Sequence, residues 1–401
     1  MALFLQTYMS VHQYIDSWIR ASCKKTDNAL KLGIISSATI NAAAIIHPVQ
    51  SHADVRLYAI ASRDASKAAS LANKYGFQKS YGAYEDLLSD KEIDFVYISL
   101  PNSLHFEWSL KALAADKNVL VEKPFTSNAR EAQILVDKAR ECGKVLMEAC
   151  AWEFHPAAHR FRQLLDSQEF GSITNTYAGI ASTPPIPSTD IRWKYELSGG
   201  SLMDMCNVVS LTRFALHAKT PDAVLHATAT ASQDDPRVDS SMVATMRFKV
   251  ANANTHFTER NVISTVYTDM ARRPAYGLVP RVWELPTICV ETELANVYFY
   301  NAAMPDIYHY IAITNKETGD TRYERMYGGG PLWGDRGKNS WSIYRYQLEA
   351  FVDKLRGRHP VWWIDGEDSI AQMKTIDEIY VASGLPLRPT NVIAALIIPS
   401  S

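Results

Sequence analysis

The sequence has few of the features that mark secreted, metal-binding or nucleic-acid-binding proteins. Only five of its 401 residues are cysteine, and Cys23, Cys142, Cys150, Cys206 and Cys289 form no C-x-x-C pair. This spacing argues against a disulfide framework and a zinc site, so we expect no metal and a reducing, cytoplasmic environment. The formal net charge of −2 gives no electrostatic reason to expect nucleic acid or an anionic membrane as a partner.

Long apolar segments are also missing. No run reaches the roughly 20 residues that a membrane-spanning helix needs, and the N-terminus lacks the basic region and long apolar core of a signal peptide. Residues 1–28 instead have apolar side chains near helical spacing. They predict an amphipathic extension that caps the first domain or a partner subunit.

Apolar residues make up 47% of the chain and charged residues 21%, which is typical of a soluble globular protein. A chain of 401 residues is too long for one ordinary core, so two main domains are expected.

The first part of the chain alternates short apolar runs with helical patterns. This rhythm predicts a Rossmann-type α/β domain, a parallel sheet covered on both faces by right-handed crossovers. The strands are expected at 32–35, 55–61, 95–99, 118–121 and 145–148, and the helices at 40–46, 65–75, 84–88, 106–115 and 129–142.

Beyond His155 the pattern changes to long stretches of β-forming residues. They predict an α+β domain with a large, mainly antiparallel open sheet, with strands at 171–182, 223–232, 241–249, 256–268 and 286–300. Helical patterns return at 341–355 and 369–382. We therefore expect an extension (1–28), a Rossmann-type domain (29–152), a substrate and dimerisation domain (153–345) and terminal helices packing back on the first domain (346–401).

Two motifs follow strands of the first domain. Val119-Leu120-Val121 runs into Glu122-Lys123-Pro124, and Pro101-Asn102-Ser103-Leu104-His105 follows the strand before it. The carboxyl ends of parallel strands are where open α/β sheets bind their ligands, so Asn102 and His105 should lie where a nicotinamide would.

With these motifs the chain resembles the glucose-fructose oxidoreductase, inositol dehydrogenase and rhizopine-catabolism (Gfo/Idh/MocA) family over roughly residues 30–390, in particular its NADP-dependent xylose dehydrogenase and dihydrodiol dehydrogenase branch. The resemblance implies that Glu122 and Lys123 hold the cofactor ribose and help set a proton path. It also implies a special peptide bond at Pro124, and a homodimer formed through the open sheet. Lys123, Asp204, Asn207 and His105 are the expected catalytic residues.

The expected dinucleotide site departs from the family pattern. The three glycine positions of the fingerprint are Ser36, Ala38 and Asn41, so the turn containing Ser37, Ala38 and Ile40 would have to bind a pyrophosphate through backbone N–H groups. The alternative is an ordinary turn that never contacts phosphate. After the second strand, Ser62 and Arg63 favour NADP over NAD, unless Arg63 is simply solvated. Leu100, Asn102 and His105 complete this set with Glu122 and Lys123.

The expected substrate site departs as well. Family members carry a pattern like G-G-G-A-x-x-D-x-G-x-Y/H here, whereas residues 198–208 read SGGSLMDMCNV. Asp204 is kept, but Val208 replaces the ring that carries a proton, so Lys123, Asp204 or Asn207 must serve instead. The other pocket candidates are Trp152, Glu153, His155, Arg192 and Trp193.

Some of these candidates have plainer interpretations. Trp152 is either a pocket residue or ordinary core, and His155 is either a base or a structural histidine. Arg192 pairs either with a substrate carboxylate or with Glu196.

Two functions remain open at this point. One is an NADP-dependent oxidoreductase acting on the carbonyl or alcohol of a small, rather apolar molecule of secondary-metabolite type. The other is a non-redox catalyst on the same scaffold, namely a cyclase or pericyclase such as a Diels-Alderase, or a lyase or isomerase, that holds a reactive conformer by shape. A binding or regulatory protein without turnover is a third, weaker possibility.

Overall fold

The computed structural model describes residues 23–397 apart from 184, 253–254, 280 and 282–283. The extension predicted over residues 1–28 therefore lies almost wholly outside the described residues. The chain divides into two compact units. Of the described residues, the parallel-sheet unit contains 23–151, Tyr344–Ser369 and 390–397, and the mixed-sheet unit contains those of Trp152–Ile343 and Ile370–Pro389. The domain boundaries expected from the sequence stay a prediction.

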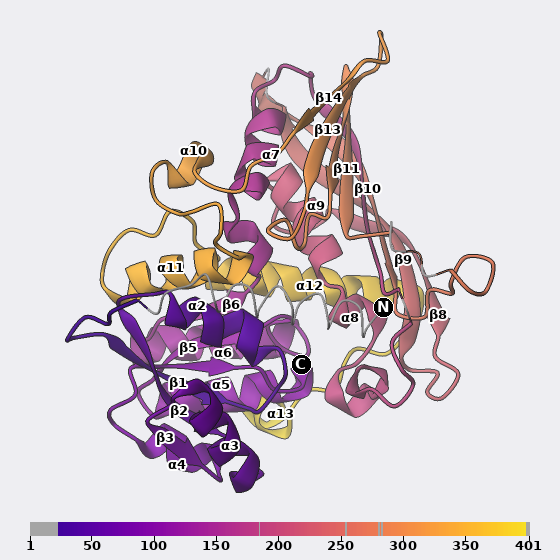
Figure 1. Cartoon of the computed structure of the whole chain (residues 1–401). Helices are drawn as coiled ribbons and strands as arrows, with labels where there is room; N and C mark the ends of the chain where they lie inside the picture. Colours follow the sequence, from indigo (N-terminus) through magenta and orange to yellow (C-terminus); the bar gives the residue numbers. More distant parts are fainter. Residues whose placement is uncertain (1–22, 184, 253–254, 280, 282–283, 398–401) are drawn as a thin grey trace. The chain divides into compact units, whose positions relative to one another are not determined.

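The parallel-sheet unit is built on six strands in the order β3-β2-β1-β4-β5-β6, all of them parallel (Figure 1). The order reverses between β1 and β4, and such a switch point is where doubly wound sheets bind ligands. The strands are β1 (Leu30–Ile35), β2 (Val55–Ala61), β3 (Lys79–Tyr81), β4 (Phe95–Ile98), β5 (Asn118–Glu122) and β6 (Leu146–Ala149).

Two helices of this unit begin at a capping side chain and end at a glycine. Asp64 accepts hydrogen bonds from the first turn of α3 and Gly76 ends that helix with φ +78°; Asn128 and Gly143 do the same for α6. The helices are α2 (His47–Gln50), α3 (Ala65–Tyr75), α4 (Tyr84–Ser89), α5 (His105–Ala114), α6 (Ala129–Cys142) and α13 (Val392–Ile397), with α11 (Ile343–Leu355) beginning at the last residue of the other unit.

The mixed-sheet unit holds eight strands in the order β14-β13-β12-β11-β7-β10-β9-β8. Among the described strands of this sheet, β10 and β7 pair in parallel and the other pairs are antiparallel. The strands are β7 (Ile173–Ala181), β8 (Ala223–Ala231), β9 (Asp239–Asn252), β10 (Thr255–Asp269), β11 (Thr287–Thr292), β12 (Ala295–Tyr300), β13 (Tyr310–Asn315) and β14 (Thr321–Glu324).

One face of this sheet forms the core of the mixed-sheet unit. Along β12, Val297 and Phe299 are buried while Tyr298 and Tyr300 are half-exposed, as the two-residue period of a strand requires. Helix α9 (Asn207–Leu216) packs against β7, β10 and β11. The unit also contains α7 (Pro156–Asp166), α8 (Ser201–Asp204) and α10 (Gly330–Trp333), and α12 (Gly366–Ser383) continues into it (Figure 1).

The fold class expected from the sequence is confirmed. Several details differ. The stretch 286–300 is two strands that turn at Glu293 and Leu294, and the first helix opens as a π-helix over Ala42–Ile46. The elements that were not expected include β3, α7, α9 and the hairpin β13–β14. Among the described residues no helix is both long and apolar enough to cross a membrane.

Candidate functional site

The turn after β1 is closed by polar side chains instead of glycines. Ser36 has φ +149°, a value that favours glycine, and it is buried. Its hydroxyl lies 2.7 Å from Ser99 Oγ and accepts from the Ala38 N–H at 3.2 Å. Asn41 Nδ2 donates to the Ser36 carbonyl oxygen at 3.1 Å, and Ser99 donates to Asn41 Oδ1 at 2.5 Å. One amide of the turn is therefore already engaged, while Ser37, Ala38 and Ile40 are not fully buried.

The end of β2 lies beside this turn. Ser62 donates to Ser37 Oγ at 3.2 Å, and Arg63 is exposed, with no hydrogen bond or ion pair to the described residues. Asp64 is occupied as the cap of α3, where hydrogen bonds from Ser66 and Lys67 lower its pKa. Two hydroxyls and an available guanidinium are the donors that a ribose 2′-phosphate requires.

His105 braces the turns that follow β4 and β5. Its Nδ1 lies 2.8 Å from the Pro124 carbonyl oxygen and its Nε2 lies 2.8 Å from the Leu100 carbonyl oxygen. Burial lowers its pKa. With both ring nitrogens facing backbone carbonyls, His105 has the arrangement of a positioning residue rather than of the catalytic group expected from the sequence. Asn102 opens the short helical turn that leads to it and is partly exposed.

Glu122 and Lys123 end β5 beside Tyr97 of β4. The Tyr97 hydroxyl donates a short hydrogen bond to Glu122 Oε1. Burial raises the pKa of Glu122, while Tyr97 and the Lys123 ammonium act in the opposite direction. Lys123 is partly exposed, and its charge also lowers the pKa of His105. The Lys123–Pro124 peptide bond is cis.

Two buried carboxylates hold the segment after Pro124. The Phe125 N–H donates to Glu148 Oε1 at 3.1 Å and the Ser127 N–H donates to Glu131 Oε2 at 3.0 Å. Burial raises the pKa of Glu131. Sequence reasoning missed both residues, although an acid at the end of an apolar strand, as at Glu148, was the available indication.

In the mixed-sheet unit, Asp204 and Arg192 form an ion pair. Arg192 Nε donates to Asp204 Oδ1 at 2.7 Å and its Nη1 donates to Asp190 Oδ1 at 3.0 Å. Both carboxylates raise the pKa of Arg192. The predicted partner Glu196 is wrong, because Glu196 pairs instead with Arg237 at 2.8 Å. Asp204, Asn207 and Trp193 are partly exposed, and the Trp193 indole donates to the Pro187 carbonyl oxygen at 3.0 Å.

The apolar candidates of this unit lie in its interior. Trp152 has 0% exposure, donates to Ser210 Oγ at 3.1 Å and packs edge-on against Phe214. Val208 is also fully buried. Their burial favours the interpretation of both as core residues, and a place in a substrate pocket stays a prediction.

His155 is likewise a structural residue. It is buried, its Nδ1 accepts from the Ala157 N–H at the start of α7, and its pKa lies well below the usual range because of burial. Glu153 is partly exposed and its backbone bonds to His159. The remaining exposed candidates of this unit, apart from Trp193, are polar.

The described residues thus present two sets of groups. In the parallel-sheet unit, backbone amides, hydroxyls, Arg63 and Lys123 lie at the carboxyl ends of β1, β2 and β5, and they fit a phosphorylated dinucleotide. In the mixed-sheet unit, Asp204, Arg192 and Asn207 can bind hydroxyl or carbonyl groups. No cluster of three or more His, Cys, Asp or Glu side chains among the described residues is arranged to hold a metal ion.

Comparison with known proteins identifies the family. The model of the oxidoreductase family with an NAD-binding Rossmann fold (GFO_IDH_MocA) matches residues 30–150. The D-xylose 1-dehydrogenase (NADP(+)) 2 of Haloferax volcanii is 31% identical over 360 residues, which are 88% of this chain and 96% of that protein. The trans-1,2-dihydrobenzene-1,2-diol dehydrogenase of Xenopus tropicalis is 31% identical over 222 residues, 55% of this chain and 66% of that protein.

A similar structure supports the fold. KijD10, a 3-ketoreductase from Actinomadura kijaniata solved with NADP and TDP-benzene, superposes with a TM-score of 0.73 at 23% identity, covering 88% of this chain and 98% of its own. Its likeness shows a shared architecture of Rossmann-type domain and open sheet. Together with the xylose dehydrogenase, which aligns over nearly its whole length, these matches show that this chain belongs to the Gfo/Idh/MocA family of NAD(P)-binding oxidoreductases.

Proposed function

We propose that this chain is an NADP-dependent oxidoreductase that interconverts an alcohol and a carbonyl on a small hydroxylated molecule. The observation that carries the proposal is the group at the ends of β1 and β2, namely the Ser37 and Ser62 hydroxyls with the exposed Arg63. A 2′-phosphate needs such donors, whereas an NAD site needs an acid for the ribose hydroxyl. The nearby acid, Asp64, is held in the helix cap.

A bound nicotinamide would supply hydride transfer. The chain's own part is to hold the dinucleotide and manage a proton. Lys123 suits the second task, because it carries a partly exposed amine at the end of β5 next to Glu122. Val208 has no group that can carry a proton, which leaves Lys123 as the proton carrier in this proposal.

The exposed polar groups of the mixed-sheet unit favour a hydroxylated substrate. Asp204 and Asn207 are partly exposed, and Arg192 holds the Asp204 carboxylate. An ionised carboxylate only accepts hydrogen bonds, so Asp204 is suited to a substrate hydroxyl. The sequence favoured an apolar substrate because of residues such as Trp152 and Val208, and their burial removes that reason. The relatives named for D-xylose and for a dihydrobenzene-diol agree with a polyol or sugar-like substrate.

The cofactor proposal is tested by calorimetric titration of the dialysed protein with NADPH and with NADH. We expect micromolar NADPH binding and weaker NADH binding. Arg63→Ala should weaken the affinity for NADPH at least about tenfold, which is roughly 1.4 kcal/mol, and leave the affinity for NADH unchanged. Lys74→Ala removes one positive charge from the last turn of α3, the helix that begins two residues after Arg63, and is the control. Equal losses for NADPH and NADH in Arg63→Ala would contradict a 2′-phosphate site.

Turnover is then followed by NADPH absorbance with D-xylose, other aldoses and cyclic diols, against a set of apolar alcohols. Lys123→Met should abolish turnover and weaken NADPH binding by less than about tenfold, because the groups proposed to bind the phosphates remain. Full turnover in Lys123→Met would remove Lys123 from the proton path.

A second candidate, the non-redox catalyst, rests on one observation. Ser36 engages an amide of the turn expected to bind pyrophosphate, and its φ of +149° suits a glycine. If neither NADPH nor NADH binds and Ser36→Gly creates binding, the scaffold has lost its cofactor. The search would then turn to cyclisation, elimination or isomerisation of an apolar substrate.

We also propose a homodimer through the face of the eight-stranded sheet opposite α9. Tyr177 on β7 and Val243 on β9 are exposed there, and Tyr298 and Tyr300 of β12 are half-exposed. Exposed apolar groups in such numbers on one face are typical of an interaction surface.

A further inference from the structure

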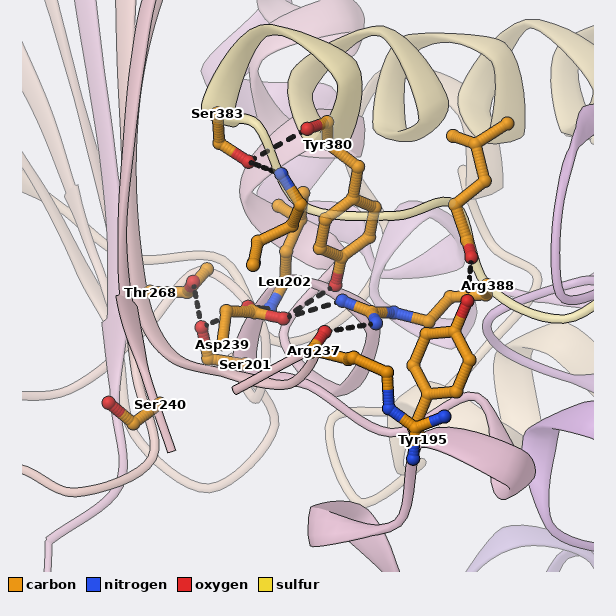
Figure 2. Close-up of polar contacts among 12 residues, drawn as sticks. Tyr195, Ser201, Leu202, Arg237, Asp239, Ser240, Thr268, Tyr380, Ser383 and Arg388 are labelled. Carbon is orange, nitrogen blue, oxygen red and sulfur yellow. Dashed lines mark hydrogen bonds and ion pairs between the residues drawn. The ribbon is translucent and has the colours of Figure 1, made fainter. Parts of the chain in front are cut away.

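Asp239, at the start of β9, is a buried carboxylate with donors on two sides (Figure 2). Its Oδ2 accepts from Ser201 Oγ at 2.6 Å and from the Leu202 N–H at 2.8 Å. Its Oδ1 accepts from the Tyr380 hydroxyl at 2.9 Å and from Arg388 Nη2 at 3.0 Å. One oxygen therefore serves α8 and the other serves the C-terminal segment.

Arg388 is equally buried and equally fixed. Its Nη1 donates to the Arg237 carbonyl oxygen at 2.8 Å, and its guanidinium lies 4.0 Å from the centre of the Tyr380 ring and 5.3 Å from that of Tyr195. Both members of the ion pair have 0% side-chain exposure. Since a buried charge without a partner costs several kcal/mol, each holds the other in place.

The pair acts directly on the helix that carries Asp204. Helix α8 has no side-chain cap of its own at Gly200, and Asp239 fills that role from β9. Gly200 has φ +136°, and a Cβ there would overlap Asp239 Oδ1. The backbone can thus approach the carboxylate closely only because residue 200 is glycine.

The same loop fixes the other side of the Asp204 ion pair. The Gly200 N–H donates to the Arg192 carbonyl oxygen at 3.0 Å, while the Arg192 side chain donates to Asp204 at 2.7 Å. The backbone of Arg192 and the helix of Asp204 therefore both depend on the residues that Asp239 holds.

We propose that the Arg388–Asp239 ion pair is a positioning device that sets the place of Asp204 and Arg192 for substrate binding. The inference rests on the proposed function for its kinetic part and on the contacts alone for its structural part. An apolar pair of similar volume would often stabilise a core as well as a buried ion pair does. Unlike an apolar pair, the charged pair provides a carboxylate oxygen, Asp239 Oδ2, that accepts hydrogen bonds from the first turn of α8. Arg388 and Asp239 act through the first turn of α8, so they are positioning residues and not catalytic ones.

The structural part is tested by amide hydrogen exchange with mass spectrometry in Arg388→Met and Asp239→Asn. Amide exchange in peptides covering residues 200–206 should accelerate at least about tenfold, because the Asp204 N–H donates to the Gly200 carbonyl oxygen and the Met205 N–H donates to that of Ser201. The exchange rate in peptides covering residues 242–248 of β9 should change less than about twofold. Arg272→Met removes an arginine that pairs with Glu284 in the same unit and is the matched control.

A milder pair of variants serves if these proteins do not fold. Ser201→Ala and Tyr380→Phe each delete one hydroxyl that donates to Asp239, the first on α8 and the second on α12. Only Ser201→Ala should accelerate exchange at 200–206. Equal acceleration of exchange in Ser201→Ala and Tyr380→Phe would overturn the positioning role. It would also be overturned if exchange did not accelerate in Ser201→Ala or in whichever of Arg388→Met and Asp239→Asn folds.

The kinetic part uses the substrate found in the NADPH screen. Arg388→Met and Asp239→Asn should each lower kcat about 30- to 100-fold, with NADPH affinity within about threefold, because a displacement near 1 Å has that effect on a reacting geometry. The double variant should lose no more than the worse single variant. Unchanged kcat together with accelerated exchange would overturn the link to catalysis. A protein without turnover would reject the proposed function and leave the exchange result to decide the structural part.

Discussion

Three buried histidines of the mixed-sheet unit have lowered pKa values. His155, His159 and His309 are buried, and burial lowers the pKa of each. The pKa of His159 falls to about 4 from its ordinary 6.5. A histidine that is neutral in the folded state takes up a proton more readily once the chain unfolds.

Stability should therefore fall in mild acid. Between pH 6.5 and about 4 the unfolded state binds a proton at His159 and the folded state does not. The free energy of unfolding therefore increases as the pH rises through this window and decreases as the pH falls. One proton corresponds to about 1.4 kcal/mol per pH unit. His159→Gln should flatten the slope by close to that amount in denaturant titrations from pH 4 to 7. A pH slope that is the same in His159→Gln and in the wild-type protein would contradict the prediction.

Residue types in the candidate site could be predicted from the sequence, but their partners could not. The places of Arg63 and Lys123 at strand ends follow from the strand pattern. Arg192 pairs with Asp204 instead of Glu196 because of the path of a loop that contains two glycines. The spacing of residues along the chain does not predict that path. The contacts of His105 with the carbonyl oxygens of Leu100 and Pro124 also depend on loop paths, so the sequence does not predict them.

At the scale of elements, predictions held where caps mark the ends. The boundaries of α3 and α6 match because Asp64 and Asn128 begin them and Gly76 and Gly143 end them. Helix α9 escaped prediction because almost every one of its residues is buried, so no polar stripe reveals the helical period. Strands β11 and β12 were read as one because their turn, Glu293-Leu294, has neither glycine nor proline.

The Gly199–Gly200 loop gives a prediction about an element. Gly200→Ala should destabilise the protein by about 3 kcal/mol or more, because the new Cβ would meet Asp239 Oδ1 and the backbone has φ +136°. Gly319→Ala, at φ +75° with nothing near, should cost only about 1 kcal/mol. Chemical unfolding of both variants measures the difference, and similar losses would mean that the loop relaxes around the added carbon.

For the whole molecule, the proposed dimer sets the expected mass in solution. Light scattering should give about twice 44.9 kDa. A stable interface buries on the order of 800 Å² per partner, so one buried charge at its centre should dissociate it. We expect monomers from Val243→Glu on β9 and dimers from Val381→Glu, which places the same charge at an exposed position of α12. A dimer that persists in Val243→Glu, or a wild-type monomer, would exclude this face.

The discontinuous path of the parallel-sheet unit has a consequence for its biosynthesis. Its six strands are complete by Ala149, but Phe95 of β4 packs on Phe351 of α11 and Glu131 accepts from the Asn391 N–H. A nascent chain leaving the ribosome must therefore carry these strands without these packing partners until α11 and Asn391 have been synthesised. Ribosomes that stall or terminate before α11 would release a parallel sheet that lacks its closing helix, the kind of product that chaperones and proteases recognise.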